Sequence, residues 1–399
     1  MLDASYRKQL ERNIPKYAWY KIFTKRVFLP LITIQLVTVG QVTLQQLAII
    51  AIITSIVQAV LQMPAGYIAD KIGNKKSIIL GASISVTSPL FYAFMPNFWG
   101  GLIASVLFFG GYAFQSGAVE AFIHNTLGAL NREKEYAKVM GRAQTYGLIG
   151  NVALVALVPL TYNIHHTLPF ILGFLSLVGM LLLTISFVHP PNDEAARIPK
   201  SPFEAIKSIV TPQNVALFVF AGFMAGVSNK GVEFRELLLQ DIGVAVGLLG
   251  FVLALSSVAG AVMGWYVHLL DRLRPLTFYF LDLVLIAGNL VLMGLTDNIA
   301  VAIVAFTIFA GYTRVRTIIF QAKMLHEIKH VYKATLISAL NLFTLLGDLI
   351  AITLLTRFVV DEGYLLGYVL FGLSVFGIGL FLWFMMLVEH RWRHSRTPA

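Results

Sequence analysis

Long apolar stretches alternate with short polar ones along almost the whole chain. Twelve of these stretches are long enough to cross a membrane, because a spanning helix needs about 20 mainly apolar residues. The predicted spans are residues 17–40, 44–69, 77–96, 99–126, 140–162, 167–189, 213–238, 244–269, 276–295, 298–324, 334–358 and 364–388. The pattern therefore predicts an all-α integral membrane protein.

A polar connection at residues 190–212 separates the sixth predicted span from the seventh. Its prolines and mixed charges predict a cytoplasmic linker. The segments GYAFQSGAVEAF (111–122) and GYTRVRTIIFQA (311–322) start alike, at an offset of 200 residues. We therefore predict two pseudo-symmetric six-helix bundles, at residues 17–189 and 213–388. Transporters duplicated in this way hold their site at the membrane midplane between the halves.

Both ends of the chain are polar. Apolar residues recur every four positions in residues 1–16, with cations elsewhere on the helical wheel, which predicts an amphipathic helix on the membrane surface. A disordered leader is the alternative. Residues 389–399 form a basic tail that we expect in the cytoplasm.

Composition and charge support the membrane assignment. Hydrophobic residues make up 57% of the chain and charged residues 13%, against about 25% charged in a soluble domain. If the N-terminus lies inside, the six outside turns hold no Lys or Arg, which predicts a multi-pass protein of the cytoplasmic membrane with both termini inside. Anionic lipid headgroups then account for the net charge of +10, and nucleic acid is not an expected partner. The chain has no cysteine, and we expect neither a metal nor a cofactor.

The polar stretch GYIADKIGNKK (66–76) lies between the second and third predicted spans. It resembles the signature loop of the major facilitator superfamily, although Asn74 stands where that family usually has a basic residue. The resemblance implies a twelve-helix transporter in which this loop latches one transport state, and the alternative is a basic turn that only fixes topology. The latch candidates are Gly66, Asp70, Lys71, Gly73, Lys75 and Arg142.

A narrower resemblance, in MPAGYIADKIGNKKS and SGAVEAFIHNTL, is to a prokaryotic subgroup of these transporters. Members of the subgroup often have Glu at the position of Gln62 and Asp at that of Asn125. Both positions are amides here, so any proton coupling that depends on those acids is lost.

Ionisable residues inside spans are costly and are functional candidates by default. A first span that began after Lys25 and Arg26 would reach Gly40 in about 21 Å, short of the roughly 30 Å hydrocarbon core. We therefore expect one of these two cations to face a central cavity. The alternative is a surface helix that bends at the membrane edge. Lys21 lies near the end of the span and can snorkel to the headgroups.

The fourth predicted span carries Ser116, Glu120 and His124 at intervals of four residues, which places one polar stripe on one helix face. Glu120 could carry a proton or balance a cation, and His124 titrates near neutral pH. An equally good interpretation is a structural pair of Glu120 with Arg142 on the fifth span.

The tenth predicted span carries Arg314 and Arg316 too far apart around the helix to face one cavity. We expect one to contact substrate and the other to pair with an acid, either Asp348 or Asp282. Tyr112 and Tyr312 are further candidates for hydrogen bonds to a substrate, although aromatic residues more often pack in such helices.

Four charged residues gather toward the outer end of the seventh predicted span. They form either an outer gate or the end of a short helix in water. They are Lys230, Glu233, Arg235 and Glu236.

These features together predict a monomeric secondary active transporter, not an enzyme, that works by alternating access on a small-molecule substrate. The buried charge balance leans positive and arginine binds carboxylates well, so we expect an organic anion or a zwitterion. Protons are a candidate coupling ion, and membrane lipid is a further partner. A proton-driven multidrug exporter and a non-transporting membrane sensor or assembly protein are the alternatives.

Overall fold

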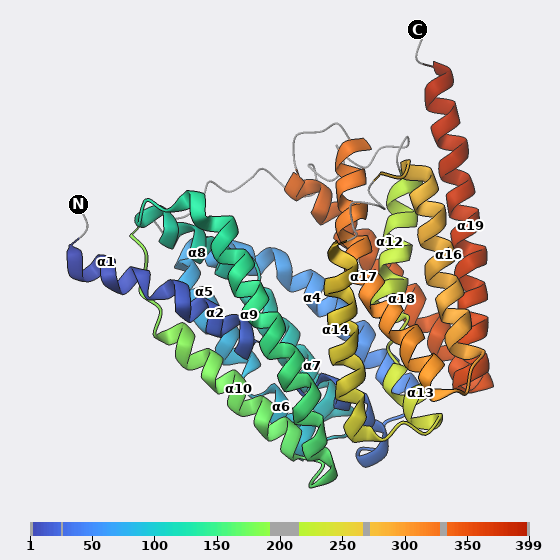
Figure 1. Cartoon of the computed structure of the whole chain (residues 1–399), viewed down its shortest axis with the longest axis horizontal. Helices are drawn as coiled ribbons and strands as arrows, with labels where there is room; N and C mark the ends of the chain where they lie inside the picture. The colour runs from blue at the N-terminus through green and yellow to red at the C-terminus, as the bar shows by residue number, and fades with distance from the viewer. Residues whose placement is uncertain (1–2, 25–26, 192–214, 266–271, 328–332, 397–399) are drawn as a thin grey trace. The chain divides into compact units, whose positions relative to one another are not determined.

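The structure is a computed structural model that describes residues 3–24, 27–191, 215–265, 272–327 and 333–396 (Figure 1). These residues are almost entirely helical and contain no strand, which confirms the predicted all-α class. The chain divides into two compact units. Unit 1 comprises Met1–Ile198 with Val246–Ala254, and unit 2 comprises Pro199–Ala245 with Leu255–Ala399.

Unit 1 contains ten α-helices with short 3₁₀ and π turns between them. The helices are α1 (Ala4–Glu11), α2 (Asn13–Phe23), α3 (Ile32–Ile34), α4 (Leu44–Ile72), α5 (Asn74–Ser85), α6 (Ser88–Phe94), α7 (Phe98–Gln115), α8 (Ala118–Ala129), α9 (Tyr136–Leu157) and α10 (Leu168–Ile185). The turns are η1 (Leu29–Leu31), η2 (Gln35–Val39), η3 (Glu133–Glu135), η4 (Val158–Asn163) and η5 (Val246–Leu248).

Unit 2 is built from longer helices. They are α12 (Val215–Lys230), α13 (Arg235–Asp241), α16 (Pro275–Gly294), α17 (Ile299–Glu327), α18 (Lys333–Glu362) and α19 (Tyr364–Arg396). The helix α14 (Leu249–Trp265) begins in unit 1, and its residues from Leu255 onward belong to unit 2.

Within the described residues, ten helices or helix runs are long and apolar enough to cross a membrane, and an eleventh exists if α12 and α13, bent by 45°, form one span. They correspond to the predicted spans from residue 44 onward. The predicted span 17–40 is not a single helix, because α2 ends at Phe23 and only the shorter apolar run Leu29–Val39 follows. Pro30 explains part of this correction, since proline has no N–H to donate and clashes with the preceding helical turn.

A buried glutamine secures the second part of that interrupted segment. Gln35 opens the π-helical turn η2 and is fully buried. Its amide nitrogen donates to the Tyr92 carbonyl at 3.2 Å and lies 3.2 Å from His166 Nδ1, and the Tyr162 hydroxyl donates to its carbonyl oxygen at 3.1 Å. These bonds satisfy a polar side chain that would be costly to bury alone.

Glycines allow pairs of helices to approach closely in both units. A Cβ added to Gly111 of α7 would lie 2.4 Å from the Gly81 carbonyl oxygen of α5. In unit 2, α12 and α18 meet through Gly222, Gly226 and Gly347, and a Cβ on Gly347 would lie 2.1 Å from the Gly222 carbonyl oxygen. In a bilayer, where lipid tails are as apolar as leucine, such close backbone packing is a main source of helix association.

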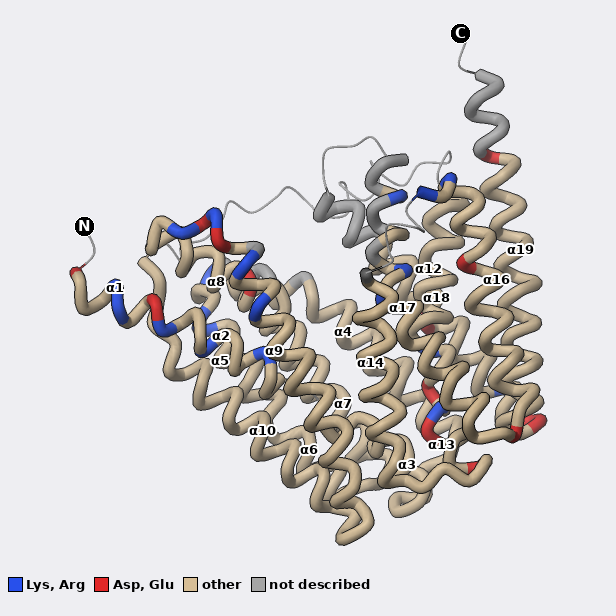
Figure 2. Tube along the Cα trace, viewed as in Figure 1, with Lys and Arg blue, Asp and Glu red and all other residues tan. Residues whose placement is uncertain are grey.

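Charge is unevenly distributed along the helices of each unit. Lys and Arg of unit 1 gather at the end of its helices where α1, α8 and the start of α9 lie (Figure 2). In unit 2, Arg272 and Arg274 precede α16 at one end, while Asp241, Asp361 and Glu362 end helices at the other. Each unit therefore has a basic end, as the sequence pattern of Lys and Arg leads us to expect.

Candidate functional site

The helix of the fourth predicted span is interrupted between α7 and α8. Ser116 is extended, with φ −62° and ψ 136°, and Gly117 has φ +76° and ψ −50°. The Ala118 N–H donates to the Ser116 carbonyl at 2.9 Å, which closes a three-residue γ-turn around Gly117. This conformation favours glycine, and irregular backbone at membrane depth is tolerated where it is buried in protein or lines a cavity.

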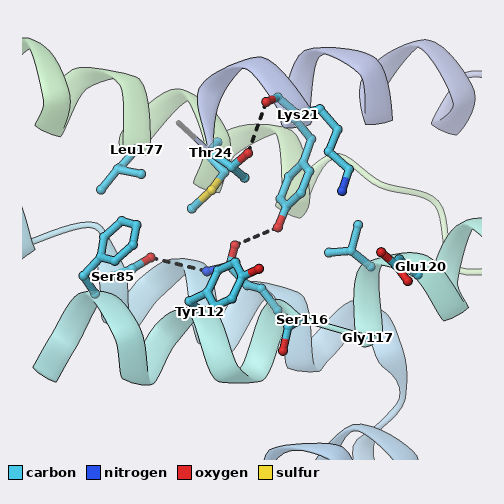
Figure 3. Close-up of a pocket in the computed structure, with 13 residues that line it drawn as sticks. Lys21, Thr24, Ser85, Tyr112, Ser116, Gly117, Glu120 and Leu177 are labelled. Carbon is cyan, nitrogen blue, oxygen red and sulfur yellow. Dashed lines mark hydrogen bonds between the residues drawn. The ribbon is translucent and has the colours of Figure 1, made fainter. Parts of the chain in front are cut away.

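A pocket in unit 1 adjoins this interruption (Figure 3). Its volume is about 120 Å³, and α2, α5, α7, α8 and α10 supply its walls. The polar residues that line it are Tyr20, Lys21, Thr24, Ser85, Tyr112, Gln115, Ser116 and Glu120. Gly117 and Val119 line it too, so the first turn of α8 borders the pocket. The Ala118 N–H is engaged in the γ-turn, and the N–H groups of Val119 and Glu120 lack intrahelical partners.

Two opposite charges face this pocket from different helices. Lys21 extends from α2, with its ammonium 5.2 Å from the centre of the Tyr17 ring, and Glu120 lies in the first turn of α8 (Figure 3). Among the described side chains, no ion pair joins Lys21 to Glu120 or to any other acid. The sequence pattern treats Lys21 as a snorkelling residue near a span end, so its place in the pocket is not foreseen.

A network of hydrogen bonds between neutral groups lies beside these two charges in the pocket wall. The Tyr20 hydroxyl donates to Gln115 Oε1 at 2.7 Å, and Gln115 Nε2 donates to the Gly111 carbonyl at 3.2 Å and to Ser85 Oγ at 3.4 Å. Tyr20 and Gln115 are both buried, so the network links α2, α5 and α7 through satisfied polar groups.

The expected stripe of Ser116, Glu120 and His124 on one continuous helix is wrong, because the helix is interrupted at Ser116 and Gly117. Ser116 and Glu120 still line the same pocket. The His124 ring instead packs edge-on against Tyr136, with 5.4 Å between the ring centres.

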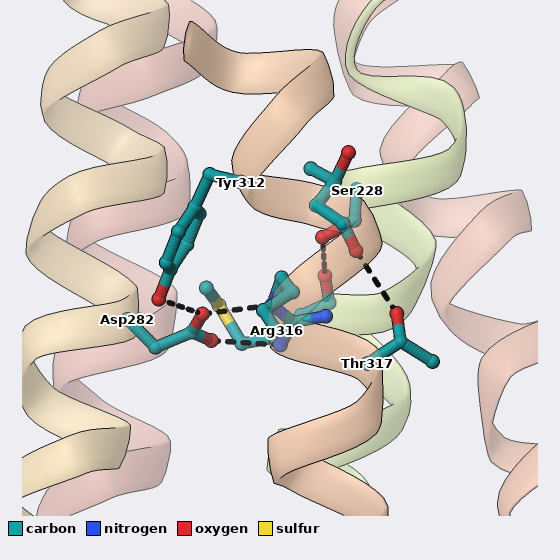
Figure 4. Close-up of polar contacts among 7 residues, drawn as sticks. Ser228, Asp282, Tyr312, Arg316 and Thr317 are labelled. Atoms are coloured by element: carbon teal, nitrogen blue, oxygen red, sulfur yellow. Dashed lines mark hydrogen bonds and ion pairs between the residues drawn. The ribbon is translucent and has the colours of Figure 1, made fainter. Parts of the chain in front are cut away.

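Unit 2 contains a buried charged network (Figure 4). Arg316 donates through Nε to Asp282 Oδ1 and through a terminal nitrogen to Oδ2, both at 2.7 Å. The Tyr312 hydroxyl donates to Asp282 Oδ1 at 2.8 Å. Arg316 is 2% exposed and Asp282 is fully buried, so α16 and α17 are joined by a bidentate ion pair away from solvent.

The neighbouring Arg314 has a different environment. It is partly exposed, and one of its terminal nitrogens donates to Ser257 Oγ of α14 at 3.2 Å. Of the two acids considered as partners for an arginine, Asp282 forms the pair, whereas Asp348 accepts a bond from the Asn229 amide at 3.1 Å.

The four gate candidates lie where α12 gives way to α13. Lys230 is 3.6 Å from Glu233, and Arg235 forms an ion pair with the buried Glu236. The helix does end at Lys230, yet Glu236 is only 5% exposed and does not lie in water.

The latch loop is described in part. Gly73, between α4 and α5, has φ +90°, which favours glycine, while Lys71 and Arg142 are exposed. Burial first, then Arg12 and Lys75, lower the pKa of Lys16 at the start of α2, so Lys75 lies in a basic neighbourhood. The surroundings of Gly66 and the side chain of Asp70 lie outside the described part of the chain, as do Lys25 and Arg26. Among described residues, no three His, Cys, Asp or Glu side chains gather as a metal site would require.

The apolar helices of the described chain define a multi-pass membrane protein. The chain belongs to the Major Facilitator Superfamily, because the family model matches residues 21–352.

Relatives of known sequence are distant. An uncharacterized MFS-type transporter of Bacillus subtilis (strain 168), YxaM, is 22% identical over 230 residues, which cover 55% of this chain and 56% of that protein. The inner membrane transport protein YajR of Escherichia coli (strain K12) is 29% identical over 154 residues, 37% of this chain and 32% of that protein. These matches span about half of the first relative and a third of the second.

A solved structure, that of the nucleoside transporter NupG, has a TM-score of 0.76 at 11% identity and covers 96% of this chain and 99% of its own. This similarity shows the fold.

Proposed function

We propose that the protein is a monomeric secondary active transporter of the cytoplasmic membrane that moves a small organic anion or zwitterion by alternating access. Membership of the Major Facilitator Superfamily supports transport. The pocket of unit 1, with Lys21, hydroxyl groups and an interrupted helix around it, supports a polar substrate with a negative group. The basic ends of the helices support cytoplasmic termini, and the duplicated segments support two six-helix bundles joined by residues 190–212.

The two alternative functions make different demands on this pocket. A multidrug exporter needs an acid in an aromatic cavity. Glu120, beside Tyr20, Phe108 and Tyr112, supports that function. Lys21 favours the anion or zwitterion, because a cationic drug would meet it as a like charge. A sensor that lost transport would have the pocket filled by apolar side chains, and the polar lining argues against that.

Flux into proteoliposomes tests the proposal. Purified full-length protein is reconstituted, and uptake of a panel of anionic, zwitterionic, cationic and neutral solutes is measured with and without a pH gradient. We expect uptake of an anionic or zwitterionic solute, reduced at least tenfold by Lys21→Gln and unchanged by Lys138→Gln, whose side chain is exposed outside the pocket. Uptake of cationic compounds alone would favour the exporter, and no flux of any solute would contradict transport.

A further inference from the structure

Within unit 1, we infer that the pocket recognises a small zwitterion of the amino-acid type, with its carboxylate at Lys21 and its ammonium at Glu120. This inference rests on the proposed transport function and narrows its substrate class. The observations that carry it are the two opposite charges, the turn at Gly117 and the small volume of the pocket.

The two charges are held on separate helices, close enough to attract each other, but among the described side chains they form no ion pair. Lys21 is fixed by its backbone, which packs so closely on α9 that a Cβ on Gly147 would lie 3.1 Å from Lys21 Cβ. Glu120 is fixed by the start of α8. Fully buried opposite charges elsewhere in the described chain do pair, as Arg316 and Asp282 do at 2.7 Å, whereas Lys21 is half-buried and Glu120 is exposed. Lys21 and Glu120 therefore remain available to groups of a ligand.

The start of α8 strengthens the anionic half of this site. Gly117 and Val119 line the pocket, and the first N–H groups of a helix carry partial positive charge and lack intrahelical partners. A ligand carboxylate between Lys21 and this helix end would have a charge and N–H donors on two sides. Glu120 remains for the ligand ammonium.

A ligand with only one charge satisfies only one side of the pocket. A simple anion leaves Glu120 as a like charge beside it, and a simple cation does the same with Lys21. Because Lys21 is half-buried and Glu120 is exposed, we expect the missing partner to weaken binding by about tenfold. The tyrosines and Phe108 border the remaining space with apolar surface, and a pocket of about 120 Å³ suits a molecule of amino-acid size.

Binding of matched single-charge analogues tests the inference. The stability of the purified full-length protein is followed by thermal shift, and affinity by titration calorimetry, with the standard L-amino acids as probes. The best binder is then compared with its amide, which keeps only the ammonium, and with its N-acetyl derivative, which keeps only the carboxylate. We expect both derivatives to bind at least tenfold more weakly than the parent.

Two variants assign the charges to their residues. Lys21→Gln should lose the preference for the amino acid over its amide, and Glu120→Gln the preference over the N-acetyl derivative. The exposed, off-pocket changes Lys138→Gln and Glu133→Gln should change neither preference. Unchanged elution and melting of each unliganded variant show that it is folded.

Two results would overturn the inference. One is an N-acetyl derivative that binds as tightly as its parent, which would make the pocket an anion site. The other is a panel in which no amino acid binds. In either case, flux of another organic anion that depends on Lys21 would leave the proposed transport function standing, whereas absence of any flux would remove both.

Discussion

Segments 111–117 and 311–317 correspond at an offset of 200 residues, yet they place their polar groups in opposite ways. In unit 2, α17 continues unbroken through its segment, and Arg316 is locked to Asp282. In unit 1 the helix stops at the position that corresponds to Arg316, which is Ser116, and a γ-turn follows. Segment 311–317 buries a charge that has its partner, whereas the interrupted backbone of segment 111–117 lines a pocket.

The tyrosines of the two segments show the same contrast. Tyr312 is 8% exposed and donates to Asp282, whereas the equivalent Tyr112 is 49% exposed and lines the pocket. The Tyr312 hydroxyl thus has its partner within the protein. Tyr112 borders the pocket, where its hydroxyl can bond a ligand, which is what a binding site requires.

The largest expected effect comes from breaking the charged network. Asp282→Asn leaves Arg316 buried without its counter-ion, and we expect a loss of about 3–5 kcal/mol in unfolding free energy. The matched change in unit 1, Gln115→Leu, leaves the Tyr20 hydroxyl without its acceptor and should cost about 1–3 kcal/mol. Denaturant unfolding of the purified protein in detergent measures both.

The double variant Asp282→Leu with Arg316→Met provides the control. It removes both charges, so most of the stability lost in Asp282→Asn should return. Equal losses for Asp282→Asn and Gln115→Leu would contradict the contrast between a charged and a neutral centre.

An intermediate effect is expected at the glycines that correspond in the two units, Gly147 and Gly347. A Cβ on Gly347 would meet only backbone atoms, at 2.1 to 3.0 Å, and these cannot move aside, so Gly347→Ala should cost about 1–3 kcal/mol. A Cβ on Gly147 would lie 3.1 Å from Lys21 atoms, and a small shift of α2 relieves it. Gly147→Ala should therefore cost less than about 1 kcal/mol in the same unfolding assay.

A glycine substitution that causes no steric contact serves as the reference for Gly347→Ala and Gly147→Ala. A Cβ on Gly288 would have no neighbour within 4 Å, so Gly288→Ala should leave stability unchanged or raise it slightly. If Gly347→Ala behaves like this reference, α12 and α18 do not pack as closely as described.

Much of the helical content follows from the sequence, because hydropathy depends on residue type and run length alone. The predicted spans from residue 44 onward correspond to helices or helix runs. The first span fails because α2 ends at Phe23 and a 3₁₀ turn that begins at Leu29 follows, which mean apolarity does not register. Pro30, in that turn, is only a partial signal, since α4 continues through Pro64.

The site was harder to predict, because contacts depend on how each helix is rotated about its axis. Their spacing in the sequence shows that Arg314 and Arg316 cannot point to the same side of a regular helix. It does not show whether Asp282 or Asp348 forms the ion pair with an arginine. Lys21 looked like a snorkelling residue, since neither the end of α2 at Phe23 nor its packing on Gly147 is visible in the composition. The pair Ser116–Gly117 within an apolar run was the available signal for the interruption.

A change at Gly117 isolates the interruption itself. A Cβ on Gly117 would meet nothing within 4 Å, so Gly117→Ala adds no steric clash and acts only through the backbone. With φ +76° and ψ −50°, a non-glycine residue is strained there, and we expect a loss of about 1–2 kcal/mol. The corresponding change in the unbroken helix, Thr317→Gly, should cost less than about 1 kcal/mol through helix propensity.

Ligand response separates the two variants more clearly than stability does. If the γ-turn shapes the pocket, Gly117→Ala relieves its strain by rebuilding helix across residues 115–118, which moves Glu120 relative to Lys21. The thermal shift produced by a transported solute should then fall in Gly117→Ala and remain unchanged in Thr317→Gly. A full ligand response in Gly117→Ala would show that the turn only ends a helix, and the contrast between the two units would reduce to the charged network around Asp282.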